Sequence, residues 1–132
     1  MSRLAQLFPG MRRAWTAGAP LPGGDFPWDA VEQLCADVAR RFPFLSDETC
    51  RRLVRSYGTL ASEMLGSARS AADMGRRFGA DLTEREVAWL VHTEWARTAE
   101  DVLWRRSKLG LRIDQPHADA LREHLAAPVH AQ

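Results

Sequence analysis

The segment from Thr93 to Leu111 constrains the fold more than any other part of the chain. Its nineteen residues hold two tryptophans, four cations and three carboxylates, and they read as helical throughout. An exposed helix has no need of two large aromatic side chains, and a helix inside a core has no room for seven charges. The segment is therefore predicted to be a helix at the edge of a core, with an unusual charged and aromatic surface.

Composition limits the kind of protein that this chain can form. Its 132 residues suffice for one domain with a single core. The hydrophobic fraction of 45% and the charged fraction of 27% are those of an ordinary soluble globular protein. The net charge of +1 favours neither nucleic acid nor an acidic membrane surface as a partner. Apolar runs are too short to span a bilayer and Pro9-Gly10 interrupts any signal sequence, so we expect neither feature.

The first 27 residues differ from the rest of the chain, because prolines and glycines recur there and leave no room for a regular element. Around Leu21-Pro22-Gly23-Gly24-Asp25 each proline disfavours helix in the residue before it, and the paired glycines permit turns. We expect residues 1–27 to be mostly irregular. They are either a disordered tail or a connector whose apolar residues pack on something else.

From residue 28 onward the apolar residues recur at helical spacing, and no run alternates between apolar and polar. The predicted helical segments are 28–42, 46–58, 59–65, a single turn at 71–74, 83–95, 98–110 and 114–128. The pattern predicts an all-α fold, a small orthogonal bundle of about five to six helices over residues 28–132, preceded by the irregular N-terminal linker.

Two sequence signatures mark helix starts in the second half of the chain. Thr83 and Glu86 have the spacing of a capping box, in which the hydroxyl accepts from the third amide and the glutamate reaches back. The helix that they open is predicted to turn Val87, Leu90, Val91 and Trp95 to one face. Thr98 and Asp101 repeat the signature, so we expect the chain to kink or restart near Thr98.

The charged residues of this region are the candidate site. On one continuous helix, Glu94, Arg97, Asp101, Arg105 and Lys108 would form a ladder of alternating charge, since they follow at steps of three and four. An ion-pair network that orients helices is the favoured interpretation, and contact with a partner domain is the alternative; direct catalysis is the least favoured. The candidate residues for the ion network or an interdomain contact are Glu94, Arg97, Asp101, Trp104, Arg105, Arg106 and Lys108.

Trp104 lies among charged residues, away from the direction of its apolar neighbours on the helical wheel. It is predicted either to fill the core or to form a docking surface, where aromatic and arginine side chains are enriched. The adjoining run Arg105-Arg106-Ser107-Lys108 would suit phosphates, but nearby carboxylates oppose it and no nucleic-acid motif accompanies it. We therefore predict no nucleic-acid binding.

Cysteine and histidine spacing does not indicate a metal site. Cys35 and Cys50 fall on the apolar sides of predicted helices, which favours buried, reduced thiols over a disulfide or a ligand. His117, Asp119 and His124 lack the spacing of a helical zinc pair. The chain also has no Gly-rich nucleotide loop and no GxSxG elbow. We predict no catalytic, cofactor-binding or metal-binding residue in it.

Short blocks of the sequence recur, in the same order, in one known family. They are Leu21-Pro22-Gly23-Gly24-Asp25, Arg41-Phe42-Pro43-Phe44-Leu45, Arg55-Ser56-Tyr57-Gly58-Thr59, Leu65-Gly66, Asp73-Met74-Gly75, Phe78-Gly79, Glu86-Val87 and, most strongly, the block from Glu94 to Arg106. From about Pro20 onward the chain resembles the helical C-terminal domain of FAD-dependent, quinone-linked glycerol-3-phosphate dehydrogenases.

The resemblance implies that the chain is part of an enzyme that oxidises sn-glycerol 3-phosphate to dihydroxyacetone phosphate with FAD and passes the electrons to quinone. It implies that the FAD-binding domain of the same polypeptide is the partner, that the fragment alone binds no FAD and is inactive, and that residues 1–27 link the two parts. A homodimer of the parent enzyme stays open. The alternative is a stand-alone helical adaptor without catalytic activity.

The resemblance also implies a location. Such a bacterial enzyme is expected in the cytoplasm or peripherally on the cytoplasmic face of the inner membrane, with membrane contact only through the parent enzyme. The domain itself would then be a structural cap that turns Arg97, Trp104 and Arg105 toward its neighbour. We expect residues 28–132 to fold without the flavin and residues 1–27 to be mobile.

Overall fold

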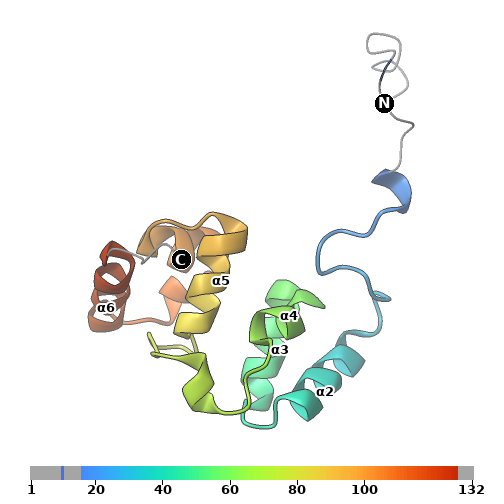
Figure 1. Cartoon of the computed structure of the whole chain (residues 1–132), viewed down its shortest axis with the longest axis horizontal. Coiled ribbons are helices and arrows are strands. Elements are labelled where there is room, and N and C mark those ends of the chain that lie inside the picture. The colour runs from blue at the N-terminus through green and yellow to red at the C-terminus, as the bar shows by residue number, and fades with distance from the viewer. Residues whose placement is uncertain (1–9, 11–15, 128–132) are drawn as a thin grey trace.

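A computed structural model describes Gly10 and residues 16–127, and it is built from helices (Figure 1). Their order is a short 3₁₀ helix η1 (Thr16–Gly18), α2 (Val31–Arg41), α3 (Asp47–Tyr57), α4 (Leu60–Leu65), the 3₁₀ turn η2 (Ala71–Met74), α5 (Glu84–Glu94), the π-helical η3 (Asp101–Arg106), the 3₁₀ turn η4 (Leu109–Leu111) and α6 (Gln115–Ala126). Within this described part no strand forms, and one isolated antiparallel bridge joins Arg77 to Thr83. The predicted all-α fold is confirmed.

The helices of the first half begin and end at local signals. The Ser46 hydroxyl accepts from the Thr49 amide at 3.2 Å and so caps α3 at the residue where the predicted segment 46–58 begins. Gly58, at φ +57, ends α3, and Gly66, at φ +56, ends α4. The first long helix, α2, begins at Val31 and not at Trp28, because Pro27 and Ala30 close a turn ahead of it.

Helix α5 begins as predicted and ends differently. The Thr83 hydroxyl accepts from the Glu86 amide at 3.5 Å, but the Glu86 carboxylate does not reach back to the cap. At the other end Trp95 adopts the left-handed conformation, with φ +58, and turns the chain out of the helix. Trp95 is 80% exposed, so the prediction that it faces the core with Leu90 is wrong.

The chain restarts at Thr98, where the sequence predicted a kink or restart. It then forms η3, whose wider turns are shown by the hydrogen bond from the Ser107 amide to the Val102 carbonyl at 3.0 Å. The Asp114 carboxylate caps α6 by accepting from the His117 amide at 3.2 Å, at the residue where the predicted segment 114–128 begins. The last residue of the predicted segment 114–128, Pro128, lies outside the described residues.

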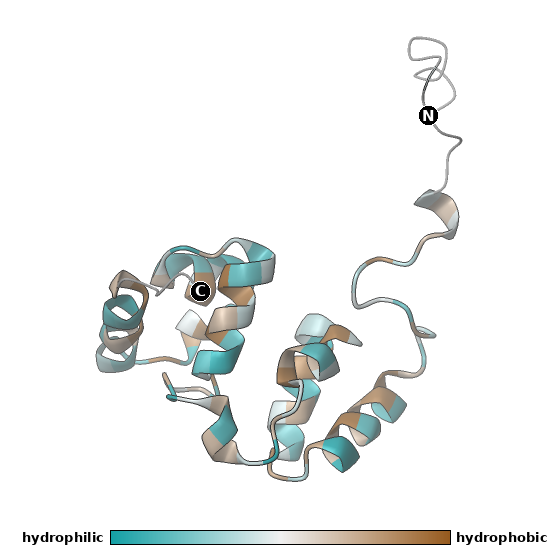
Figure 2. Ribbon diagram, viewed as in Figure 1, coloured by the Kyte–Doolittle hydropathy of each residue, from teal (hydrophilic) through white to brown (hydrophobic). Residues whose placement is uncertain are grey.

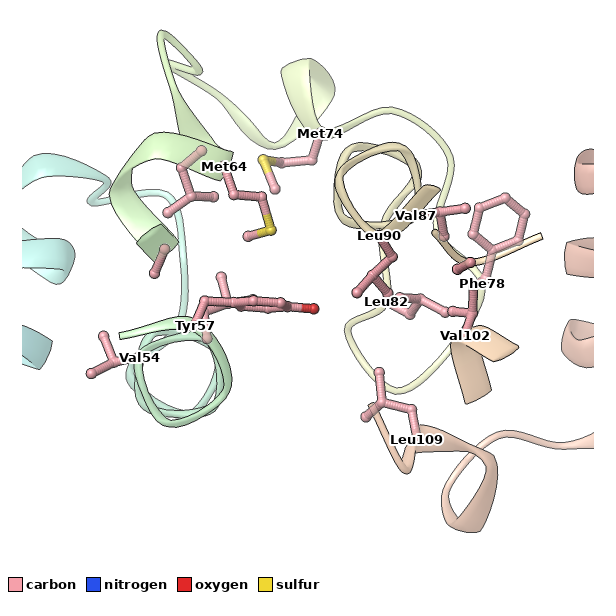
Figure 3. Close-up of a cluster of buried hydrophobic side chains, with 14 of the residues drawn as sticks. Val54, Tyr57, Met64, Met74, Phe78, Leu82, Val87, Leu90, Val102 and Leu109 are labelled. Carbon is pink, nitrogen blue, oxygen red and sulfur yellow. The ribbon is translucent and has the colours of Figure 1, made fainter. Parts of the chain in front are cut away.

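The core is one cluster of buried hydrophobic side chains, to which both the first half of the chain (α2 to α4) and the second half (α5 to α6) contribute (Figure 3). Tyr57 reaches from α3 toward Leu90 and Leu82 on the other side, and Met64 and Met74 lie above it in the view. Figure 2 shows that α2 and α5 carry both apolar and polar residues, as amphipathic helices do. Each large side chain fully buried here contributes about 1.5–3 kcal/mol.

The cysteines lie in this core. Cys35 is 8% exposed, Cys50 is 1% exposed, and both are free thiols, which confirms the prediction of buried, reduced cysteines. Among the residues described, no group of three or more histidine, cysteine, aspartate or glutamate side chains is placed to hold a metal ion. In the same part of the chain, no helix combines the length and the apolar character needed to cross a membrane.

Candidate interdomain surface

The junction between α5 and η3 breaks the predicted charge ladder. Residues 95–98 are not helical, so Glu94 and Arg97 do not stand on the same helix as Asp101. Glu94 pairs instead with Arg106, whose Nη1 lies 3.3 Å from its Oε2. The continuous ladder is therefore wrong in its geometry, because the left-handed residue Trp95 rotates the second segment away from the first.

Asp101 organises the start of η3. Its Oδ2 accepts from the amides of Arg97 and Thr98, each at 3.0 Å, and its own amide donates to the Thr98 hydroxyl at 3.1 Å. Its Oδ1 also pairs with Arg105. The two backbone hydrogen bonds and the Arg105 guanidinium hold the pKa of Asp101 well below its usual range. Asp101 thus serves as a cap and as the partner of one ladder cation.

Trp104 and Lys108 close the other end of this segment. The Trp104 ring lies directly over Gly110, where any side chain would collide with it, and it remains 45% exposed. The Lys108 ammonium donates to the Trp104 carbonyl at 2.5 Å. Trp104 therefore neither fills the core nor projects freely, and it covers the turn between η3 and η4.

Each charged residue of the candidate set can now be placed. Asp101 pairs with Arg105, Glu94 pairs with Arg106, and Lys108 binds a carbonyl. Arg97 is exposed, and its side chain makes no ion pair with any residue that the structure describes. The candidate residues thus form two separate ion pairs, and one of their carboxylates, Asp101, also caps η3.

A buried polar cluster between α3 and α5 was not expected from the sequence. The Glu86 carboxylate is 1% exposed and accepts from Arg52 Nη1 at 2.8 Å, from Arg52 Nη2 at 2.7 Å and from the Tyr57 hydroxyl at 2.8 Å. Arg52 Nη2 also donates to the Asp81 carbonyl at 3.3 Å. Glu86 has the spacing of a capping-box residue, so the sequence pattern predicted that it caps α5. The pattern contained no signal for its hydrogen bonds to Arg52 and Tyr57, which are distant in sequence.

The second unexpected feature is a strap, residues 21–26, that packs on the body of the domain. The Gly23 carbonyl accepts from the Thr59 amide at 3.1 Å, and the Thr59 hydroxyl donates to the Asp25 carboxylate. Gly23 and Gly58 cross so closely that a side chain on either would overlap with backbone of the other segment. The strap and the end of α3 border an open groove of about 360 Å³, which Glu94 of α5 also lines.

These features describe an all-helical domain that an N-terminal strap joins at one end. The sequence model of one family, described as the C-terminal domain of alpha-glycerophosphate oxidase, matches residues 14–127. The chain belongs to this family. The resemblance noted from the short sequence blocks is thereby confirmed.

Curated proteins with similar sequences carry dehydrogenase names. The chain is 41% identical over 95% of its length to a glycerol-3-phosphate dehydrogenase of Pseudomonas aeruginosa. It is 38% identical over 86% of its length to the aerobic glycerol-3-phosphate dehydrogenase of Escherichia coli, and 36% identical over 93% to D-erythritol 1-phosphate dehydrogenase of Brucella abortus. It spans only 23–24% of the length of these relatives.

Proposed function

We propose that this chain is the C-terminal domain of a dehydrogenase that oxidises sn-glycerol 3-phosphate to dihydroxyacetone phosphate with FAD and passes the electrons to quinone. The observation that carries the proposal is that nearly the whole chain matches a segment of glycerol-3-phosphate dehydrogenases, and that this segment is about one quarter of the length of each of those enzymes. In that enzyme FAD supplies the hydride acceptor. The work of this domain is to pack beside the part that holds the flavin.

The described residues do not themselves fit FAD. A flavin dinucleotide needs a Gly-rich turn between a strand and a helix for its pyrophosphate, and no strand forms among the residues described. The groove beside the strap measures about 360 Å³ and is open to solvent, which is small for such a cofactor. No step of the reaction is therefore assigned to residues of this chain.

Sequence similarity in this domain does not decide which polyol phosphate the whole protein oxidises. Relatives named for glycerol 3-phosphate are 35–41% identical to the chain, and the one named for erythritol 1-phosphate is 36% identical. Oxidation of D-erythritol 1-phosphate is thus the second candidate activity for the whole protein. The stand-alone adaptor is a weaker proposal, since the curated relatives cited above are about four times longer than the segment they share with the chain.

The partner in this proposal is the FAD-binding domain of the same polypeptide, with the homodimer of the parent enzyme as a further contact still open. The location that goes with it is the cytoplasm or the cytoplasmic face of the inner membrane. The proposal is supported by the family. The segment with Arg97, Trp104 and Arg105 is the part of the surface that the sequence singled out for contact, but in the structure the charges of Asp101, Arg105, Glu94 and Arg106 are paired within the chain.

The test is the mass of the native protein, measured in its source cells with an antibody against residues 28–127. A band about four times heavier than 14.8 kDa is expected, because the relatives are about four times longer than the matched segment. That band should co-purify with flavin and with dye reduction driven by glycerol 3-phosphate. A flavin-free band at 14.8 kDa would overturn the proposal. Turnover with D-erythritol 1-phosphate alone would select the second candidate.

A further inference from the structure

The strap fixes the place at which the polypeptide enters the domain. Gly23 and Gly58 cross in backbone contact; the Leu60 side chain lies beside Gly23 and the Phe26 ring lies beside Gly58. Both glycines have positive φ, +78 and +57, so the crossing depends on residues without a side chain. The chain leading to Leu21 therefore leaves the domain from one defined edge.

Two of the exposed large apolar side chains either line the groove or directly follow a residue that lines it. Leu21, which lines the groove beside the strap, is 80% exposed. Trp95 directly follows Glu94, another lining residue, and is also 80% exposed. Exposed aromatic and aliphatic side chains beside a concave surface are typical of a contact with another protein surface.

The charges at the groove suggest what the contacting surface carries. Arg55 lines the groove and forms no ion pair with the residues that the structure describes, whereas Glu94 is neutralised by Arg106. Within the described part of the chain, the Arg55 guanidinium is therefore a positive charge without an ion-pair partner among the apolar residues that line the groove. A partner with an apolar side chain for the groove and a carboxylate for Arg55 complements it.

We propose that the docking surface, made of Leu21, Arg55, Ser56, Glu94 and Trp95, receives the part of the same polypeptide that precedes the strap. This inference rests on the proposed function and specifies which face of the domain makes the interdomain contact. The strap holds the incoming chain at the rim of the groove, so the preceding part has a high effective concentration there. A second copy of the domain would have no such tether.

The test is hydroxyl-radical footprinting of the native flavoenzyme and of the 132-residue chain, compared side by side. The expected result is that oxidation of Trp95 and Leu21 falls by at least about fivefold in the flavoenzyme, in line with the full desolvation of anchor residues. Leu111, which is 78% exposed in the chain, serves as the internal control and keeps its reactivity. Protection of Trp104 and Leu111 with Trp95 still reactive would overturn the proposal.

A matched pair of variants separates docking from folding. Trp95→Ala in the flavoenzyme is expected to speed proteolytic cleavage ahead of the strap by about tenfold, as loss of a tryptophan anchor does. Leu111→Ala is the control and leaves the cleavage rate unchanged, and Trp95→Ala leaves the unfolding midpoint of the 132-residue chain unchanged. A native mass of 14.8 kDa overturns the proposed function itself, whereas a heavy flavoprotein with reactive Trp95 overturns only the docking surface.

Discussion

Arg52 of α3 holds Glu86 of α5 by two parallel hydrogen bonds, 2.8 Å and 2.7 Å long, across 34 positions of sequence. The carboxylate is 1% exposed, and the Arg52 side chain is 14% exposed. The Tyr57 hydroxyl donates to the same carboxylate and completes the group. Such a pair depends on both partners, since either one alone would be a buried charge.

Glu86→Gln is therefore expected to lower the free energy of unfolding by about 3–5 kcal/mol, because it leaves the Arg52 guanidinium buried without a counter-charge. Urea unfolding followed by circular dichroism measures the change. Glu63→Gln is the matched control, since Glu63 is exposed on α4 and should change stability by less than about 0.5 kcal/mol. Equal stability of the two variants would show that the buried pair does not hold α3 to α5.

Tyr57 is the only tyrosine of the chain, so its ionisation can be followed without interference. Burial raises the pKa of Tyr57 well above its usual range, and the Glu86 charge and hydrogen bond raise it further. The resulting stabilisation is complete below the unfolded pKa of about 10 and is lost as the pH rises toward the folded pKa. We expect ultraviolet difference spectra to show no tyrosinate until the chain unfolds. A titration near pH 10 in the folded protein would contradict this.

Asp101 should make the stability of the folded chain fall at low pH, whereas Tyr57 makes it fall at high pH. Hydrogen bonds from the Arg97 and Thr98 amides lower its pKa in the folded chain, so its stabilisation is complete above the unfolded pKa of about 4 and declines as the pH falls further. Asp101→Asn is expected to lower the stability at neutral pH and to flatten its decline below about pH 4. Urea unfolding over a pH series measures both effects. A variant with the wild-type acid slope would exclude this role.

The crossing of the strap over Gly58 gives a prediction with an internal control. Gly58→Ala should displace Gly23, because the new methyl group overlaps with its carbonyl and because φ +57 disfavours alanine. We expect a loss of about 1–3 kcal/mol and faster hydrogen exchange of the Thr59 amide. Gly18→Ala has open space around it and should change neither quantity. Unaltered Thr59 protection in Gly58→Ala would show that the strap tolerates a side chain.

Truncation tests the predicted boundary between the linker and the helical part. A chain of residues 28–132 is expected to fold, since the buried cluster lies after residue 28. It should nevertheless be less stable than residues 20–132, because it lacks the Gly23–Thr59 hydrogen bond and the packing of Phe26. Thermal unfolding of the two chains compares them. Equal midpoints would place the strap outside the cooperative unit.

Local signals in the sequence predicted much of this fold. The Ser46, Thr98 and Asp114 caps act within four residues of chain, and the structure has all three. The glycines that end α3 and α4 were also recognisable, since positive φ selects glycine. Short-range physics of this kind requires no knowledge of the tertiary structure.

The errors arose where tertiary contacts override a local pattern. Glu86 has the spacing of a capping residue, yet Arg52 and Tyr57 draw it into the core from 34 and 29 positions away. Trp95 continues the apolar stripe of α5, yet its left-handed backbone turns it into solvent. In the candidate site, the Asp101–Arg105 spacing predicted a real pair, whereas the Glu94–Arg106 pair depends on a turn that the pattern did not show.

The Gly23–Gly58 crossing has a consequence for how related chains can vary. Insertions and deletions are tolerated where backbone is neither buried nor hydrogen-bonded. Between Gly23 and Thr59 the register is set by a hydrogen bond and by contact between two backbones, so a residue gained or lost inside the strap would shift both. Length differences among relatives should therefore accumulate on the N-terminal side of Leu21, and the strap itself should keep its length.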